Sequence, residues 1–121
     1  MDRNFLLIGS VAGFLGVALG AFGAHGLRGR LSPEMMQVFE TGVRYHLYHA
    51  LAIVATAAIM GRIDGSRLLL VAGWSFTAGI VLFSGSLYVV ALTGISVFGA
   101  ITPIGGLAFL AGWACLAIAS F

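Results

Sequence analysis

The fold of this chain is decided by residues 5–27, FLLIGSVAGFLGVALGAFGAHGL. His25 is the only titratable side chain in this stretch. Its length matches the roughly 20 apolar residues that a helix needs to cross a bilayer. It also exceeds the roughly 7–15 apolar residues of a signal-peptide core. We therefore expect a membrane-spanning helix that stays in the mature protein.

Glycine recurs in this stretch at intervals of three or four residues. On a helix that turns about 100° per residue, such positions fall on one narrow strip. Small residues let a neighbouring helix approach closely inside a membrane. The pattern predicts that a second helix packs on this strip, and shorter small-residue strips recur in later spans. The predicted helix-packing positions are Gly9, Gly13, Gly16, Gly20, Gly23, Gly79, Gly105 and Gly112.

The composition excludes most other classes of protein. Of 121 residues, 60% are hydrophobic and 8% are charged, whereas soluble domains have about 25% charged residues. The basic residues are scattered arginines, so no basic patch indicates nucleic-acid binding. The lipid bilayer is the expected surrounding.

The chain is expected to form a single integral membrane domain, residues 1–121. Ser32, Pro33 and Glu34 have the residue types of a helix start, and a short interfacial helix at about 33–43 is expected before the second span. Gly42 is expected to bend this helix where it enters the bilayer. The last helix is taken to begin at Pro103; the alternative is that Pro103 kinks a longer helix. The four expected spans are about 5–27, 44–60, 68–92 and 103–121.

These features predict an all-α fold, a four-helix transmembrane bundle with a short interfacial helix before the second span. An even number of spans places both termini on the same side of the membrane. Arg3, Arg62 and Arg67 lie on that side, and Arg28 and Arg30 lie on the other, with Arg44 near the boundary. Counting only arginines clear of the spans favours cytoplasmic termini.

Three histidines are the main candidates for a functional site. His25 ends the first span, and His46 and His49 lie on one face at the start of the second. Ionisable groups at membrane depth are candidates for function, and imidazole binds metal ions or transfers protons. The predicted polar cluster under the headgroups is His25, His46, His49, Glu40 and Arg44.

The simpler alternative is that these side chains are anchors at the membrane interface, where histidine and tyrosine are common. On a regular first helix, His25 points away from the glycine strip, which argues against three converging imidazoles. The metal site and the cofactor therefore stay unknown, with His25 and His49 as the candidate ligands.

Several motifs together resemble one family. Residues 20–26, GAFGAHG, residues 41–52, TGVRYHLYHALA, residues 82–88, LFSGSLY, and residues 102–106, TPIGG, occur in its order. The chain resembles the YgdD family of small integral membrane proteins, whose function is unknown. The resemblance implies a four-helix protein of the bacterial inner membrane. It implies no activity, and it makes His25 and His49 better candidates for a shared role than His46.

Three functions are compatible with the sequence. The first is a non-enzymatic membrane protein that packs with itself, as a homo-oligomer, or with a membrane protein partner. The second is a small transporter or channel component, with a path near Ser75, Thr77 and Ser84. The third is a metal, heme or quinone site near His25 and His49. No motif of an enzyme family is present, and we expect no enzyme.

Overall fold

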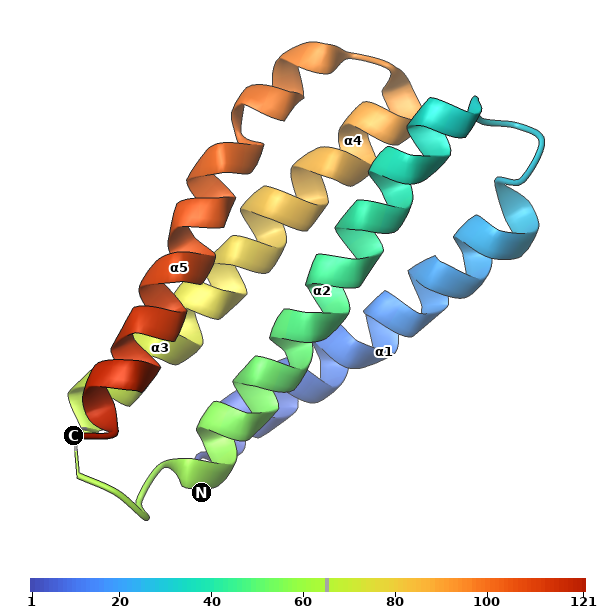
Figure 1. Cartoon of the computed structure of the whole chain (residues 1–121). Helices are drawn as coiled ribbons and strands as arrows, with labels where there is room; N and C mark the ends of the chain where they lie inside the picture. The colour runs from blue at the N-terminus through green and yellow to red at the C-terminus, as the bar shows by residue number, and fades with distance from the viewer. Residues whose placement is uncertain (65) are drawn as a thin grey trace.

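The computed structural model describes residues 1–64 and 66–121, without the side chain of Ser66. It confirms the all-α fold class: four long helical rods form the bundle, and the described residues contain no strand (Figure 1). Both termini lie at the same end of the bundle, opposite the connection between the first two helices (Figure 1). The elements are α1 Arg3–Gly26, α2 Pro33–Ile59, α3 Ser66–Gly79, the π-helix η1 Ile80–Ser84, α4 Gly85–Thr93, the 3₁₀-helix η2 Ser96–Ala100 and α5 Thr102–Ala119.

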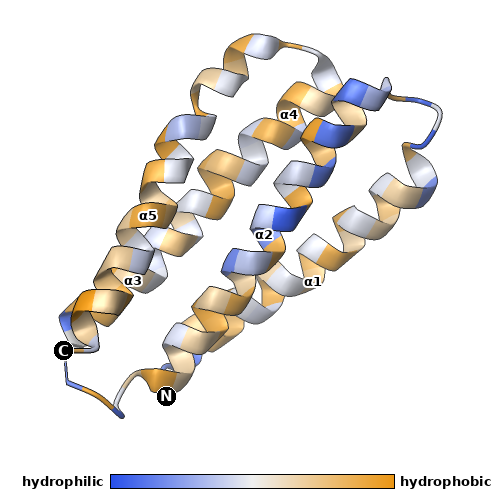
Figure 2. Cartoon of the chain, viewed as in Figure 1, coloured by the Kyte–Doolittle hydropathy of each residue, from blue (hydrophilic) through white to orange (hydrophobic). Residues whose placement is uncertain are grey.

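Three helical segments in the described part are long and apolar enough to cross a membrane: Arg3–Gly26, Arg67–Thr93 and Ser96–Ala119. The second of these is one rod made of α3, η1 and α4, and the third joins η2 to α5. α2 is not among the three, because polar side chains interrupt its first half (Figure 2). It nevertheless runs beside the other rods through the whole bundle (Figure 1).

α2 is one continuous helix, with no break between the expected interfacial segment and the expected second span. It begins where the sequence predicts: the Ser32 hydroxyl accepts the Met35 backbone N–H at 3.1 Å, and Pro33 is its first residue. Its 27 residues make it about 40 Å long at 1.5 Å per residue. The helix continues through Gly42, whose missing side chain admits Tyr88: a Cβ there would lie 2.8 Å from the Tyr88 ring.

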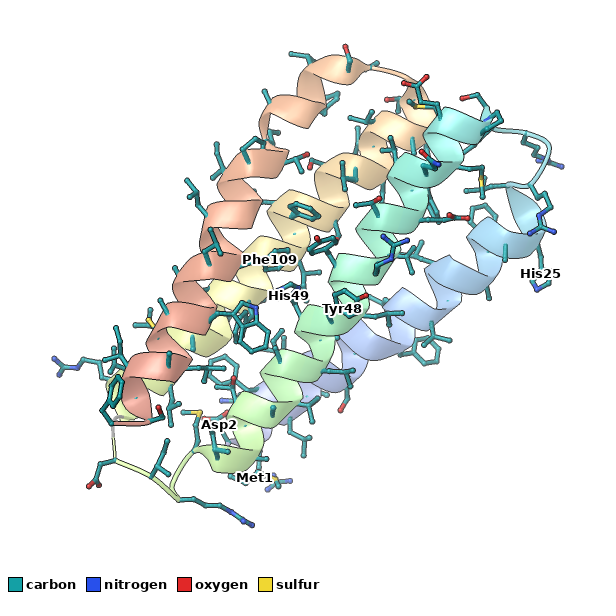
Figure 3. All side chains as sticks on the ribbon, viewed as in Figure 1. Met1, Asp2, His25, Tyr48, His49 and Phe109 are labelled. Carbon is teal, nitrogen blue, oxygen red and sulfur yellow. The ribbon has the colours of Figure 1, made fainter. Side chains whose placement is uncertain are left out.

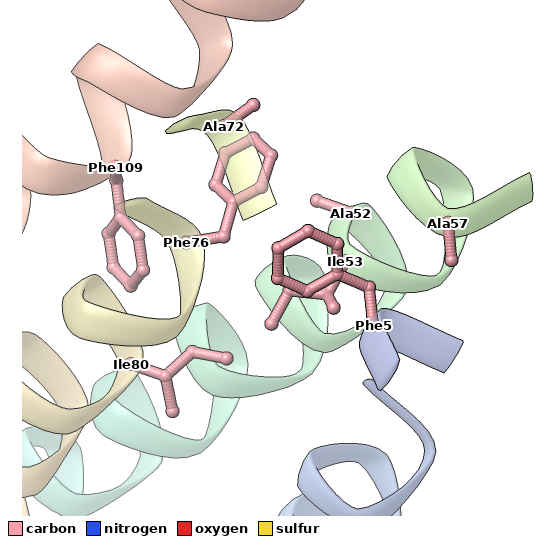
Figure 4. Packing of buried hydrophobic residues seen from close by; sticks show 8 residues of the cluster. All are labelled: Phe5, Ala52, Ile53, Ala57, Ala72, Phe76, Ile80 and Phe109. Carbon is pink, nitrogen blue, oxygen red and sulfur yellow. The ribbon is translucent and has the colours of Figure 1, made fainter. Parts of the chain in front are cut away.

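The rods pack in two hairpins that meet at α2. α1 packs along α2, and α5 packs on α3 and η1. α2 also contacts α3, η1 and α4, and it therefore joins the two hairpins. One hydrophobic cluster lies around Ile53 and Phe76 between these helices (Figure 4).

Most glycines at the helix crossings hold an aromatic ring of the neighbouring helix. Phe39 fills the space at Gly23, where a Cβ would lie 2.6 Å from its ring, and Phe76 fills the space at Gly112, with a corresponding distance of 2.5 Å. Phe109 occupies the space at Gly79 in the same way. Missing side chains in this bundle therefore make room chiefly for rings.

Backbone comes close at two further crossings. A Cβ at Gly9 would lie 3.0 Å from the backbone nitrogen of Val54 in α2. A Cβ at Gly105 would collide with the backbone of Phe83 in η1. Gly16 and Gly20 face Leu47 and Val43 of α2: Cβ atoms at these glycines would lie 2.6 and 3.2 Å from the two side chains.

Gly13 differs from the other glycines of the α1 strip. No atom within the chain lies within 4 Å of the position that its Cβ would take. The strip as a whole is covered by α2, but at Gly13 it is open.

Candidate functional site

The two histidines of α2 are buried at the centre of the molecule. His46 lies at the midpoint of α2 and His49 one turn further along, with exposed fractions of 5% and 4%. At 1.5 Å per residue, His46 is about 20 Å from the start of the helix. The two side chains therefore lie deep in the bundle.

His46 joins three helices. Its Nε2–H donates to the backbone carbonyl of Ala12 in α1 at 2.7 Å, and its Nδ1 accepts the Tyr88 hydroxyl of α4 at 2.8 Å. A carbonyl can only accept, so the proton of the neutral ring must be on Nε2. Gly16 of α1 makes this approach possible, because a Cβ there would lie 3.2 Å from the His46 ring.

His49 has the opposite tautomer. Its Nδ1–H donates to the carbonyl of Tyr45 one turn earlier, at 2.7 Å, and its Nε2 accepts the indole N–H of Trp113 in α5 at 3.1 Å. Its ring stacks on Phe109 with centroids 3.5 Å apart and planes 8° apart (Figure 3). α2 is thus bonded to α5 through a side chain, although the two helices share little backbone contact.

These bonds use both nitrogens of each imidazole. A metal ion or heme iron would need the lone pair of His49 Nε2 or His46 Nδ1, and would have to displace Trp113 or Tyr88 to reach it. Within residues 1–64 and 66–121, no three His, Cys, Asp or Glu side chains lie close enough together to hold a metal ion. The arrangement is suited to holding helices together in lipid, where packing and polar bonds replace the hydrophobic effect between helices.

The structure does not bring the predicted polar cluster together. His25 is exposed at the end of α1, far from His49 in the centre of the bundle (Figure 3). Glu40 and Arg44 are exposed on the outside of α2, whereas His46 and His49 are buried. The reason is that α2 is already helical from Pro33, which places the two histidines near its middle, on the face that packs against the other helices.

Two of the three hydroxyls that were expected near a polar path, those of Thr77 and Ser84, bond to backbone carbonyls. Thr77 donates to the carbonyl of Gly73 in its own helix at 2.8 Å. Ser84 is fully buried and donates to the carbonyl of Gly42 in α2 at 2.6 Å. Among the described residues, no buried side-chain nitrogen or oxygen is left without a partner.

The outer face of α2 is polar in its first half. Positions three or four residues apart are exposed along the whole helix and share one narrow face. We call this face the α2 ridge, and it consists of Gln37, Glu40, Arg44, Tyr48, Leu51 and Ala55. Two of its six side chains are charged, in a helix whose other faces are covered by α1, α3 and α4.

Open clefts lie on both sides of the α2 ridge. Between α1 and α2 there is a cleft of about 410 Å³ at Gly13 and Leu51, and a second of about 320 Å³ at Gly20 and Arg44. Leu47 lines both clefts, and we call the two together the α1–α2 groove. Between α2 and α5, a cleft of about 400 Å³ is lined by aromatic side chains and His49.

A further cleft of about 560 Å³ lies between α1 and the α3–η1–α4 rod. It is almost wholly apolar, and His46, Thr77 and Tyr88 are among its lining residues. From α2, His46 and Ile53 line it.

Sequence reasoning missed the partners of the two histidines. Tyr88 and Trp113 are 42 and 64 residues away from His46 and His49 in the chain. Their aromatic type indicated only anchoring or helix packing. No local spacing signals such a pair, because the partner comes from another helix.

Comparison with known proteins identifies relatives of the whole chain. Residues 19–106 match a family model described as "Protein of unknown function (DUF423)". The UPF0382 membrane protein YwdK of Bacillus subtilis is 47% identical over 118 residues, covering 98% of this chain and 96% of its own. UPF0382 membrane proteins of Staphylococcus haemolyticus and Staphylococcus aureus are 49% and 46% identical, each with 98% of this chain and 96% of its own covered.

No solved structure matches this chain. The resemblance noted in the sequence is therefore supported as a resemblance to membrane proteins of unknown function. The name YgdD does not occur among the relatives given above.

Proposed function

Since this chain belongs to the DUF423 family, whose named relatives are membrane proteins, we propose that it works by helix packing. It is a non-enzymatic protein, one integral domain of the inner (cytoplasmic) membrane, that binds another membrane protein or forms a homo-oligomer. The α2 ridge is the surface that binds.

The observation that supports this proposal is the exposure of charged and polar side chains on the central helix. Glu40, Arg44 and Tyr48 are exposed on the ridge, whereas the face of α2 that carries Phe39, His46 and Ile53 is buried. A charged side chain that faces lipid costs free energy, by about 2.5–3.5 kcal/mol for arginine at the centre of a helix on insertion scales. A protein partner that covers the ridge removes much of this cost.

The test is photo-crosslinking in native membranes. A photoreactive amino acid at Tyr48 is expected to give protein adducts, because this side chain is 54% exposed on the ridge. The same group at Leu107, 66% exposed on α5, is the matched control and is expected to give lipid adducts. Lipid adducts at both positions, with monomers alone in native mass spectrometry, would contradict the proposal.

The cleft beside His49 favours a second candidate function, the binding of a lipid-soluble aromatic ligand such as a quinone. Tyr45, Tyr48 and Trp113 line it together with His49, and rings of this kind stack on one another. Organic extraction of the purified protein followed by mass spectrometry tests this function. A stoichiometric quinone that is lost in Trp113→Ala but retained in Trp74→Ala would support it; recovery of phospholipid alone would exclude it.

A further inference from the structure

We propose that the α2 ridge binds a second copy of this chain in the same orientation, about a twofold axis along the membrane normal. Each ridge then lies in the α1–α2 groove of the partner. This inference rests on the proposed function and names the partner of that surface.

The charges on the ridge are self-complementary. Glu40 and Arg44 are exposed one helical turn apart and have opposite signs. In a parallel twofold dimer, the same surface meets itself, and each residue keeps the depth that it has in the other copy. Glu40 of each copy then lies one helical turn, about 6 Å in depth, from Arg44 of the other. The long arginine side chain spans this offset, and two equivalent ion pairs form.

The groove offers the space that such a partner needs. Gly13 lines the cleft of about 410 Å³ in this groove, and no atom lies within 4 Å of the position that its Cβ would take. Leu51 lines the same part of the groove and is 69% exposed. Because the twofold axis keeps depth unchanged, Leu51 of the partner lies at the level of Gly13 and fills the open position.

Glu40 and Arg44 line the other cleft of the same groove, of about 320 Å³. The charged and the apolar half of the groove thus share Leu47. Each half of the partner's ridge meets the half of the groove that has the same polarity. An acyl chain has no charged group that could pair with Glu40 or Arg44, so it fits only the apolar half. A second copy brings both charged and apolar side chains and fits both halves.

The first experiment is cysteine crosslinking of the full chain in native membranes. The single native cysteine is replaced in Cys115→Ser, and two differently tagged copies are co-expressed: one carries Gly13→Cys, and the other carries Leu51→Cys or the control Leu107→Cys. Mild oxidation is expected to give a disulfide between the two tagged copies with Leu51→Cys and at least tenfold less with Leu107→Cys. Equal dimer yields at the two positions would overturn the proposal.

The second experiment tests the charges by native mass spectrometry from membranes. Glu40→Arg alone and Arg44→Glu alone are each expected to lower the dimer-to-monomer ratio at least fivefold, because like charges then face each other. The double variant Glu40→Arg/Arg44→Glu is expected to restore the ratio. A double variant that is as monomeric as the single ones would contradict the ion pairs.

The third experiment compares two open glycines. Gly13→Leu is expected to abolish the dimer, and Gly85→Leu is expected to retain it, since neither Cβ meets an atom of its own chain. Unchanged circular dichroism and thermal unfolding show that the monomer still folds. If Gly13→Leu retains the dimer, the groove is not the contact surface.

The outcomes separate this inference from the proposed function. Monomeric wild-type protein with only lipid adducts at Tyr48 overturns both. A different protein crosslinked at Leu51 overturns this inference and supports the proposed function, and so does a wild-type dimer that none of these substitutions changes.

Discussion

At the scale of single residues, a neutral histidine in a membrane bundle acts as a crosslink with two ends. His46 donates to the Ala12 carbonyl from one nitrogen and accepts the Tyr88 hydroxyl at the other. Because the Ala12 carbonyl can only accept, the proton of the neutral His46 ring is on Nε2. The sequence predicted that the histidines were special. The described structure does not gather them with His25, Glu40 and Arg44, because His46 and His49 are buried mid-helix whereas those three side chains are exposed.

Removing the Tyr88 hydroxyl is expected to destabilise the protein. Tyr88→Phe leaves His46 Nδ1 without a donor, and the expected cost is about 1 kcal/mol of unfolding free energy. In the background His46→Leu, Tyr88→Phe is expected to lower the unfolding free energy by less. The difference between the two losses is the coupling free energy of the pair, which we expect to be about 0.6 kcal/mol and at most roughly 2 kcal/mol. Unfolding in detergent measures all four variants.

Tyr45→Phe is the control for this cycle. Tyr45 packs its ring on Phe83, with centroids 4.8 Å apart, and this contact does not use the hydroxyl. The unfolding free energy of Tyr45→Phe is therefore expected to match that of the wild type. Equal losses for Tyr88→Phe with and without His46 would show that the bond contributes nothing.

At the scale of elements, the third rod is shaped by its π-helix. The N–H of Gly85 bonds to the carbonyl of Ile80, five residues earlier. This wider turn lies where the rod meets two neighbours: Ser84 bonds to Gly42 of α2, and the Phe83 backbone presses on Gly105 of α5. The sequence predicted one long span here but did not predict the π turn, since nothing in an apolar run marks it.

The crossings in this region differ in what they tolerate. Gly105→Ala is expected to destabilise more than Gly112→Ala, because its Cβ meets the backbone of Phe83, whereas a Cβ at Gly112 meets the Phe76 ring. Overpacking of this kind costs about 1–3 kcal/mol, and we expect Gly105→Ala at the upper end of that range. Thermal unfolding in detergent gives the order.

Gly85→Ala is the matched control, since no atom lies within 4 Å of its Cβ position. It is expected to be neutral, or to gain part of the roughly 1 kcal/mol by which alanine exceeds glycine in helices. Equal effects at the three glycines would mean that the crossings are not tightly packed.

At the scale of the whole molecule, the bundle is organised around its least apolar helix. α2 joins the two hairpins, and its buried face carries both histidines and the small residues Gly42, Ala50 and Ala57. Its polar groups are tolerated inside the bundle because other helices satisfy them. Hydropathy ranks this helix below the other three, although it holds the bundle together.

The position of the chain ends gives a topology prediction. Both termini lie at one end of the bundle, and the connection that follows Leu27 lies at the other (Figure 1). Reporters fused before Met1 and after Phe121 are expected to give the same response, cytoplasmic by the arginine distribution. A reporter inserted at Arg30 is expected to give the opposite response. Opposite responses from the two termini would contradict a bundle that crosses the membrane four times.

The sequence by itself determined the class of the protein and the all-α fold. Long apolar runs require helices in lipid, because backbone groups there must bond within their own segment. It also identified the glycine strip of α1, since the period of a helix is fixed and can be counted along the chain.

The tertiary structure alone decided what each glycine and each histidine meets. Gly23 holds a ring, Gly105 touches backbone, and Gly13 stays open; the three are the same residue at similar spacings. His46 and His49 find partners 42 and 64 residues away. Such pairings depend on the rotation and depth of one helix against another, and these are set by the packing of all the rods together.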